Sequence, residues 1–384
     1  MASREAKLRK LNEFRRKRPH ISAKALADTL QGVKDDGMPE LHDRNHLRQA
    51  RDLVASQHTP FGPMIQEIDV SLSDGSRRKL PFAFPAALLY VALMSSVALN
   101  ALFATRMDDI PPSPEHPWNL ILYSDEVTPG SVLSPNNARK FQALYFSFLE
   151  LGPYALSREE SWFPLMTEYS KVVNEVEASL SQVFGAIIKS IFNPEYFDLQ
   201  TAGINLPIGD GRRLWAKLGV FLQDGAAHQM MWSARTGMSR MCLLCANVFT
   251  EKSELVAEDG SSLLKCNIVH EKDLVFATDD SLRMDARYLE GKAGTMTKPK
   301  FDKLQQALGI THRPGSLLLD RDLDHIIKPS EQYMHDWMHT LFANGIVNTM
   351  VFLLFEAFID EDRRTYKLVK QGNYTNAFYM LVFL

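Results

Sequence analysis

The chain has few cysteines and little net charge, and each shortage argues against a class of protein. Only three cysteines occur in 384 residues, too few for a framework of paired disulfides, so a reducing compartment is expected. A formal net charge of −3 gives no overall signature of nucleic-acid binding. The N-terminus is basic and lacks the apolar core of a signal peptide. With 45% hydrophobic and 23% charged residues, the composition predicts a folded protein of two or three units.

Positive charge is concentrated at the N-terminus, where residues 1–18 carry eight basic and two acidic side chains. Its densest part is Arg15, Arg16, Lys17 and Arg18. Such a run predicts contact with DNA phosphates or a nuclear address, and a solvated first helix is the alternative. A second helix is expected from Ala23 to Lys34 before Gly37 and Pro39, and two short helices around a turn permit a DNA-binding arrangement.

One long segment lacks charge altogether. Residues 80–104 contain no charged side chain, and the part after Pro85, residues 86–104, is expected to be one apolar helix. It is long enough to span a bilayer, but Ser95, Ser96 and Asn100 dilute its hydrophobic character. A buried core helix is therefore favoured, and a membrane anchor is the alternative.

The rest of the pattern alternates strands and helices, with no internal repeat. Two of the expected strands end on an aspartate, Asp125 and Asp224, and a helix is expected to open at Gly225. The other expected elements are a hairpin at 64–79 with its turn at Asp74-Gly75, strands at 118–125, 141–149 and 214–223, and an amphipathic helix at 162–192.

Aspartates at the ends of neighbouring strands indicate a metal site. Asp125 and Asp224 offer hard carboxylate oxygens on short stems, which suit Mg²⁺. Paired metals activate the attacking oxygen and stabilise the leaving oxygen in phosphoryl transfer. The alternative is that each aspartate is an ordinary turn or helix-cap residue.

The cysteines indicate a second kind of metal. Cys242, Cys245, Cys266 and His270 follow the spacing Cys-x2-Cys-x20-Cys-x3-His, which is typical of a closed tetrahedral zinc site. Three buried cysteines that act as small hydrophobes are the alternative.

A third polar cluster covers residues 333–339. If this segment is helical, His335 and His339 share one face and Asp336 and His339 share another. The Asp-x-x-His pair would then orient the backbone or border a metal site, and a polar patch is the alternative.

The order and spacing of these motifs resemble the catalytic domain of CACTA-like eukaryotic cut-and-paste (DDE/D) transposases. The resemblance covers roughly residues 115–350 and depends on three stretches, residues 120–130, 221–245 and 333–347. It implies a ribonuclease H-like mixed sheet in which Asp125 and Asp224 bind Mg²⁺. Cys242 and Cys245 would belong to a helical, zinc-bearing insertion, and Asp336 and His339 would form the insertion's Asp-x-x-His motif.

The resemblance departs from the family after His339. The third acid of the family lies well beyond the Asp-x-x-His motif, whereas 45 residues follow it here, with Glu356, Asp360 and Glu361 arriving early. We therefore expect the third acid to be missing, as in a truncated or domesticated relative. The expected regions are 1–60 (basic, helical), 61–115 (hairpin and apolar helix), 116–235 (first part of the sheet), 236–345 (Cys/His insertion) and 346–384 (C-terminal helical segment).

The sequence thus predicts an α/β protein derived from a transposase, which cleaves and joins DNA if its acidic triad is complete. A zinc-stabilised DNA- or protein-binding module without catalysis is the first alternative, and a membrane protein anchored by residues 86–104 is the second. The expected cofactors are structural Zn²⁺ and catalytic Mg²⁺. The expected partner is DNA, a homo-oligomer is left open, and no small-molecule substrate is expected. The nucleus is the expected location, with the cytoplasm as alternative.

Overall fold

The structure is a computed structural model, and the chain divides into two compact units, Met1–Gln57 and His58–Leu384. The structure describes residues 23–37, 43–56, 58–129, 137–193, 197–235, 242–256, 262–268 and 270–336, together with residues 341, 347, 350 and 351.

The first unit contains two described helices, α2 (Ala23–Asp36) and α3 (Arg44–Ala55). The helix expected from residue 23 is confirmed, and it ends before Gly37, whose φ of +84° continues no right-handed helix. The basic residues Arg15, Arg16, Lys17 and Arg18 lie outside the described residues.

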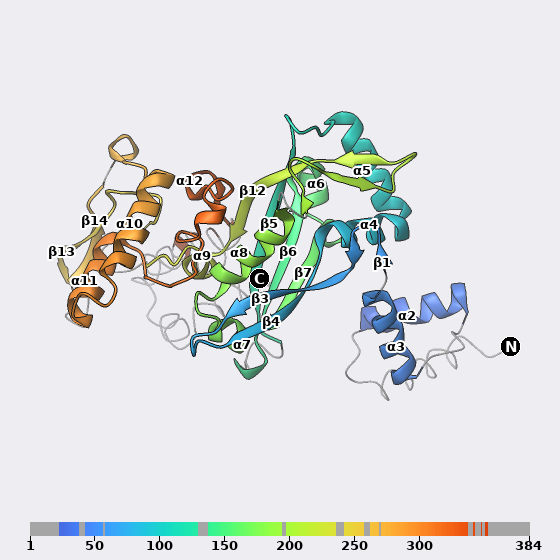
Figure 1. Ribbon diagram of the computed structural model, residues 1–384, viewed down its shortest axis with the longest axis horizontal. Coiled ribbons are helices and arrows are strands. Elements are labelled where there is room, and N and C mark those ends of the chain that lie inside the picture. The colour runs from blue at the N-terminus through green and yellow to red at the C-terminus, as the bar shows by residue number, and fades with distance from the viewer. Residues whose placement is uncertain are drawn as a thin grey trace, which may run out of the picture. The chain divides into compact units, whose positions relative to one another are not determined.

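The second unit is a mixed α/β structure built on a five-stranded sheet (Figure 1). The strand order is β15-β12-β5-β6-β7, in which β5, β12 and β15 are parallel and β6 is antiparallel to both of its neighbours. These strands are β5 (Trp118–Val127), β6 (Phe141–Phe148), β7 (Phe163–Tyr169), β12 (Ala216–Gln223) and β15 (Tyr333–His335). The near-continuous apolar sequence of β5 agrees with burial on both faces.

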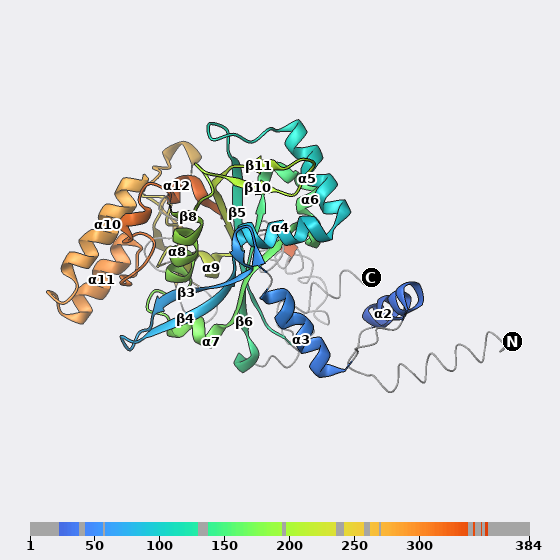
Figure 2. The same cartoon turned by 45° about the vertical axis from the view of Figure 1, so that its right-hand side comes forward.

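One face of this sheet packs on the main hydrophobic core. Helix α8 (Leu180–Ile191) buries its apolar residues at helical spacing against this face, and the Phe184 ring meets the Phe221 ring of β12 at 5.6 Å. In Figures 1 and 2, α8 and the hairpin of β3 (Ile65–Ser71) and β4 (Arg77–Ala83) lie against the sheet. The expected hairpin is confirmed, and Asp74 closes its turn by accepting a hydrogen bond from the Ser76 amide at 2.9 Å.

The single helix predicted for 162–192 is wrong in its first half. Residues Phe163–Tyr169 form β7, because Leu144 of β6 pairs with Met166 and draws this segment into the sheet. Apolar side chains recur at helical spacing only from Val172 onward, and this part of the prediction corresponds to two helices, α7 (Ser170–Glu175) and α8. Ser179, at a φ of +52°, separates them.

The apolar run at 86–104 is not one helix, as expected, but two. Helix α4 (Pro85–Ser95) and helix α5 (Val97–Asp109) meet at a bend of 113°. Ser96 ends the first and caps the second, since its Oγ accepts from the Leu99 amide at 3.2 Å. Leu89 and Phe103 lie in the core. Among the described residues no single helix meets the length and hydropathy of a membrane span; the bent pair meets them only together.

Between β12 and β15, the described residues form the hairpin of β13 (Thr250–Val256) and β14 (Ser262–Cys266) and four α-helices, α9 (Gly225–Met231), α10 (Asp279–Lys292), α11 (Lys298–Leu308) and α12 (Pro329–Gln332). In both views, α10 and α11 lie at the opposite side of the sheet from α4 and α5 (Figures 1 and 2). The remaining elements are the short helix α6 (Pro153–Leu156) and short strands around the sheet: β1 (His58–Thr59), β2 (Gly62–Pro63), β8 (Phe192–Asn193), β9 (Phe197–Asp198), β10 (Ile204–Leu206) and β11 (Arg212–Leu214).

Candidate functional site

Three aspartates lie side by side at the carboxyl ends of the three parallel strands. Ser124 of β5 pairs with Gln223 of β12, so the next residues, Asp125 and Asp224, are neighbours. On the other side of β12, the Asp336 amide donates to the Gln223 carbonyl at 2.9 Å, which continues the parallel ladder and sets Asp336 beside Asp224. We call Asp125, Asp224 and Asp336 the aspartate row.

The register places the whole row on one face of the sheet. Residues opposite one another on neighbouring strands point to the same face, and strands lie about 4.8 Å apart. Asp224 is therefore about one strand spacing from Asp125 and from Asp336. The expectation that Asp125 and Asp224 lie on adjacent strands agrees with the structure, and their role as metal ligands stays a prediction. Asp336 was expected in a separate motif, and its place in the row comes from the structure alone.

Asp224 is also a helix-cap residue, which was the alternative to a metal ligand in the sequence analysis. Its Oδ1 accepts a hydrogen bond from the Ala227 amide at 2.6 Å, so it is the N-cap of α9. The helix expected to open at Gly225 is confirmed. This hydrogen bond occupies Oδ1 and fixes the orientation of the Asp224 side chain, which is the middle residue of the row.

Tyr123 lies one step before the row on the same face of β5. Burial raises the pKa of Tyr123, and the negative charges of Asp125, Asp336 and Asp224 raise it further, together with a hydrogen bond to Asp125. The phenol therefore stays protonated and donates to the Asp125 carboxylate. The Trp162 ring packs on Tyr123 at 5.7 Å between centroids and limits its movement.

The opposite face of β15 is held by a buried histidine that the sequence gave no signal for. His228 of α9 is 0% exposed, stacks on Tyr333 at 3.7 Å, and has its Nε2 2.9 Å from the Met334 carbonyl oxygen. Desolvation lowers the pKa of His228 to about 4, so the ring is neutral and Nε2 donates. The helix on which the side chains of 333–339 would share faces is not present at Tyr333–His335, which form β15.

The aspartate row does not form a closed set of metal ligands. Among the residues that the structure describes, no three His, Cys, Asp or Glu side chains are arranged as a metal site. The chemistry of the donors still fits Mg²⁺, because carboxylate oxygens on short, rigid stems are the ligands that this ion takes. Adjacent negative charges also repel one another, and a divalent cation would relieve that repulsion.

A hollow of about 430 Å³ lies at the same end of the sheet, at β6 and β7, and none of the three aspartates is among its described lining residues. Thr167 of β7, which lines the hollow, is opposite Ala143 of β6, and Ala143 is opposite Asp125, so the wall of the hollow is about two strand spacings from the row. Arg139 and Tyr169 also line it, and Tyr169 is 58% exposed. An arginine beside an exposed aromatic ring suits the backbone and bases of a nucleic-acid strand.

The two segments that carry the predicted zinc ligands are hydrogen bonded to each other. Asn267, next to Cys266, donates from Nδ2 to the Asn247 carbonyl at 2.9 Å, and its Oδ1 accepts from the Phe249 amide at 2.7 Å. Asn247 in turn follows closely after Cys245. These bonds hold the strand end of β14 beside the loop after Cys245.

The structure describes part of the predicted zinc site, and the zinc ion stays a prediction. Cys242 and Cys245 are partly buried and His270 is exposed. The side chain of Cys266 and the whole of His339 lie outside the described residues.

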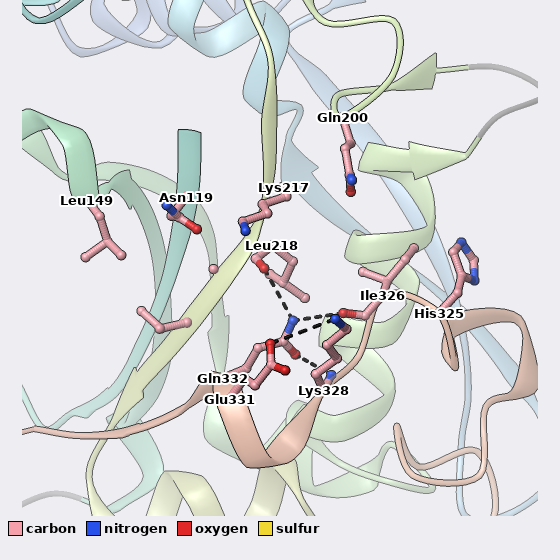
Figure 3. Close-up of a pocket in the computed structure, with 12 residues that line it drawn as sticks. Asn119, Leu149, Gln200, Lys217, Leu218, His325, Ile326, Lys328, Glu331 and Gln332 are labelled. Atoms are coloured by element: carbon pink, nitrogen blue, oxygen red, sulfur yellow. Dashed lines mark hydrogen bonds and ion pairs between the residues drawn. The ribbon is translucent and has the colours of Figure 1, made fainter. Parts of the chain in front are cut away.

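A second cavity, of about 300 Å³, lies beside the first half of β12 (Figure 3). Gln332 crosses its floor and donates from Nε2 to the carbonyl oxygens of Leu218 at 3.3 Å and Ile326 at 2.8 Å. Lys217 and Lys328 also line it. None of the predicted site residues is among its described lining residues, so this cavity is separate from the aspartate row.

The chain matches no protein-family model and no curated protein.

Proposed function

We propose that the chain is a transposase-derived protein with a ribonuclease H-like sheet, which acts on DNA by phosphoryl transfer at the aspartate row. The observation that carries the proposal is the register that makes Asp125 and Asp224 neighbours at the ends of parallel strands. A mixed sheet with acids at the ends of its central strands agrees with what the family resemblance implies. The long segment between β12 and β15 corresponds to the insertion of that family. The proposed partner is DNA and the proposed location is the nucleus.

The residues of the row have separate tasks in this proposal. Asp125 and Asp224 would hold Mg²⁺, and the ion supplies activation of the attacking oxygen and stabilisation of the leaving oxygen. Tyr123 donates to Asp125 and orients its carboxylate, while the cap bond to Ala227 fixes Asp224. The hollow with Arg139 and Tyr169 takes the DNA strand next to the acids.

A DNA-cleavage assay tests this function. The full chain, Asp125→Asn, Asp224→Asn and the exposed control Asp210→Asn are incubated with DNA and Mg²⁺. We expect both row variants to lose activity by more than about a hundredfold, because loss of a partner in the shell behind a metal ligand already costs 10–100-fold. The control should match the unchanged chain. Equal activity in all four proteins would overturn the proposal.

The alternative is a DNA- or protein-binding module that lacks catalysis. The observation in its favour is that the described side chains of the row form no closed ligand set. The two functions differ in the same assay, since a binding module retains DNA binding but shows no metal-dependent cleavage with the unchanged chain.

We further propose that Cys242, Cys245, Cys266 and His270 hold a structural zinc ion. The hydrogen bonds of Asn267 support this, because they join the two segments that would supply the ligands. Elemental analysis of the purified chain should give about one zinc per molecule, and Cys245→Ser should lose it. A zinc-free wild-type protein that is fully folded would contradict the assignment.

A further inference from the structure

We propose that the cavity beside the first half of β12 binds a phosphate group carried by a small molecule, between the ammonium groups of Lys217 and Lys328. This site is independent of the proposed function, because no residue of the aspartate row is among the described lining residues of the cavity. The volume of about 300 Å³ lies at the lower end of the range for pockets that bind small molecules.

The cavity lies at the edge of β12 that β15 leaves open. Strand β15 pairs only with Phe221–Gln223, so no described strand pairs with residues 216–220 on that side. The side chain of Gln332 spans the gap instead, since its Nε2 donates to the Leu218 carbonyl at 3.3 Å and its Oε1 accepts from the Lys328 amide at 2.8 Å. Gln332 is only 3% exposed, so these bonds fix the backbone of Lys328 against β12 and the cavity exists without a ligand.

A β-bulge forms the wall of the cavity. The pairing of β12 with β5 shifts between Leu218 and Val220, which leaves Gly219 as an extra residue. A Cβ on Gly219 would lie 2.8 Å from the Cβ of Asn119, so glycine permits this close approach of the two strands. All four of these residues line the cavity. Bulges are frequent beside functional sites, where they redirect side chains, and this one comes directly after Lys217 and Leu218.

The cavity carries an excess of positive charge. Lys217 forms no ion pair with any residue that the structure describes. Lys328 pairs with Glu331 at 3.9 Å, but these side chains are 50% and 69% exposed, so the pair is weak. Glu331 is the single acid among the described lining residues. Figure 3 shows Leu218 between the two lysines, so they approach the cavity from β12 and from the residues just before α12.

A phosphate monoester matches this arrangement. It carries nearly two negative charges at neutral pH, and lysine binds phosphate as a compact point charge. A carboxylate has only one charge for the two ammonium groups. Gln200 adds an amide that donates hydrogen bonds, and Leu149 and Ile326 provide apolar surface for the organic part of the ligand.

Calorimetric titration of the full chain tests the proposal. The probes are inorganic phosphate, adenosine monophosphate and a short single-stranded oligothymidine. We expect both small probes to bind to the unchanged chain. Lys217→Gln and Lys328→Gln should each weaken this binding by about tenfold or more, because each removes a charge-assisted contact. The control Lys300→Gln, at an exposed position that does not line the cavity, should bind as the unchanged chain.

Thermal unfolding of the same proteins gives a second readout. Adenosine monophosphate should raise the melting temperature of the unchanged chain and of Lys300→Gln, and raise that of the two cavity variants much less, because a ligand stabilises the form it binds. The Lys328 side chain is 50% exposed, so Lys328→Gln decides the matter if Lys217→Gln fails to fold.

The three probes distinguish the sources of the phosphate. Binding of inorganic phosphate alone, weakened in both cavity variants, supports the site and excludes a nucleotide as its ligand. Absence of binding by both small probes at about 10 mM would overturn the proposal, as would equal binding in the unchanged chain and both cavity variants. Binding of oligothymidine alone, weakened in Lys217→Gln, would also overturn it and assign the lysines to a nucleic-acid surface.

Discussion

The buried His228 makes the stability of the second unit depend on pH. In the folded chain its pKa is lowered to about 4 by desolvation, whereas the unfolded side chain has the ordinary value of 6.5. Between these values the unfolded chain binds a proton that the folded chain does not, so the free energy of unfolding falls as the pH decreases from 6.5 to about 4. At about 1.36 kcal/mol per pKa unit, the loss amounts to about 3 kcal/mol.

Urea denaturation at pH 7 and at pH 4 measures this loss. His228→Phe keeps an aromatic ring against Tyr333 but loses the hydrogen bond to the Met334 carbonyl, so the variant should be less stable than the unchanged chain at pH 7. Because phenylalanine does not titrate, the variant should lose about 3 kcal/mol less of its free energy of unfolding on acidification. Desolvation also lowers the pKa of His335, which acts in the same direction, so His335→Asn is measured in parallel. An acid-induced loss of equal size in His228→Phe and in the unchanged chain would refute the reasoning.

Two further predictions concern the sheet and the hollow beside the row. A Cβ on Gly219 would lie 2.8 Å from the Cβ of Asn119, so Gly219→Ala should lower the free energy of unfolding by about 1–3 kcal/mol. Gly225→Ala is the control, because a Cβ there has nothing within 4 Å and should change the free energy of unfolding little. Equal effects of the two substitutions would contradict the close packing at Gly219. Arg139→Ala should weaken DNA binding and lower the slope of its salt dependence by about one, the value for one phosphate contact. The exposed control Lys300→Ala should leave both the affinity and the slope unchanged. An unchanged slope in Arg139→Ala would exclude a contact of Arg139 with a phosphate.

Much of the sheet was predictable because its central strands carry strong local signals. The strand predicted for 118–125 lies in β5, and the one predicted for 214–223 is confirmed from Ala216 onward as β12, directly before Asp224. The cap role of Asp224 was also visible, since Asp before Gly225 is a common helix start. These features depend on neighbouring residues in the sequence.

The parts that were missed depend on contacts between distant segments. Residues 163–169 form a strand because they pair with β6, although the helical spacing of the residues after them predicted a helix. Strand β15 is three residues long, too short for any periodicity, and it is defined by its pairing with β12 and its contact with His228. No local pattern specifies which residue of one strand lies opposite which residue of another, so the place of Asp336 could not be read from the sequence.

Locating the metal tests most directly whether the aspartates bind it. A crystal of the full chain soaked in Mn²⁺ and measured near the manganese absorption edge would show the ion by its anomalous signal. We expect a peak at the carboxyl ends of β5, β12 and β15, within about 2.5 Å of oxygens of Asp125 and Asp224. A well-ordered aspartate row with no anomalous peak beside it, in a crystal that binds Mn²⁺ elsewhere, would contradict the central claim.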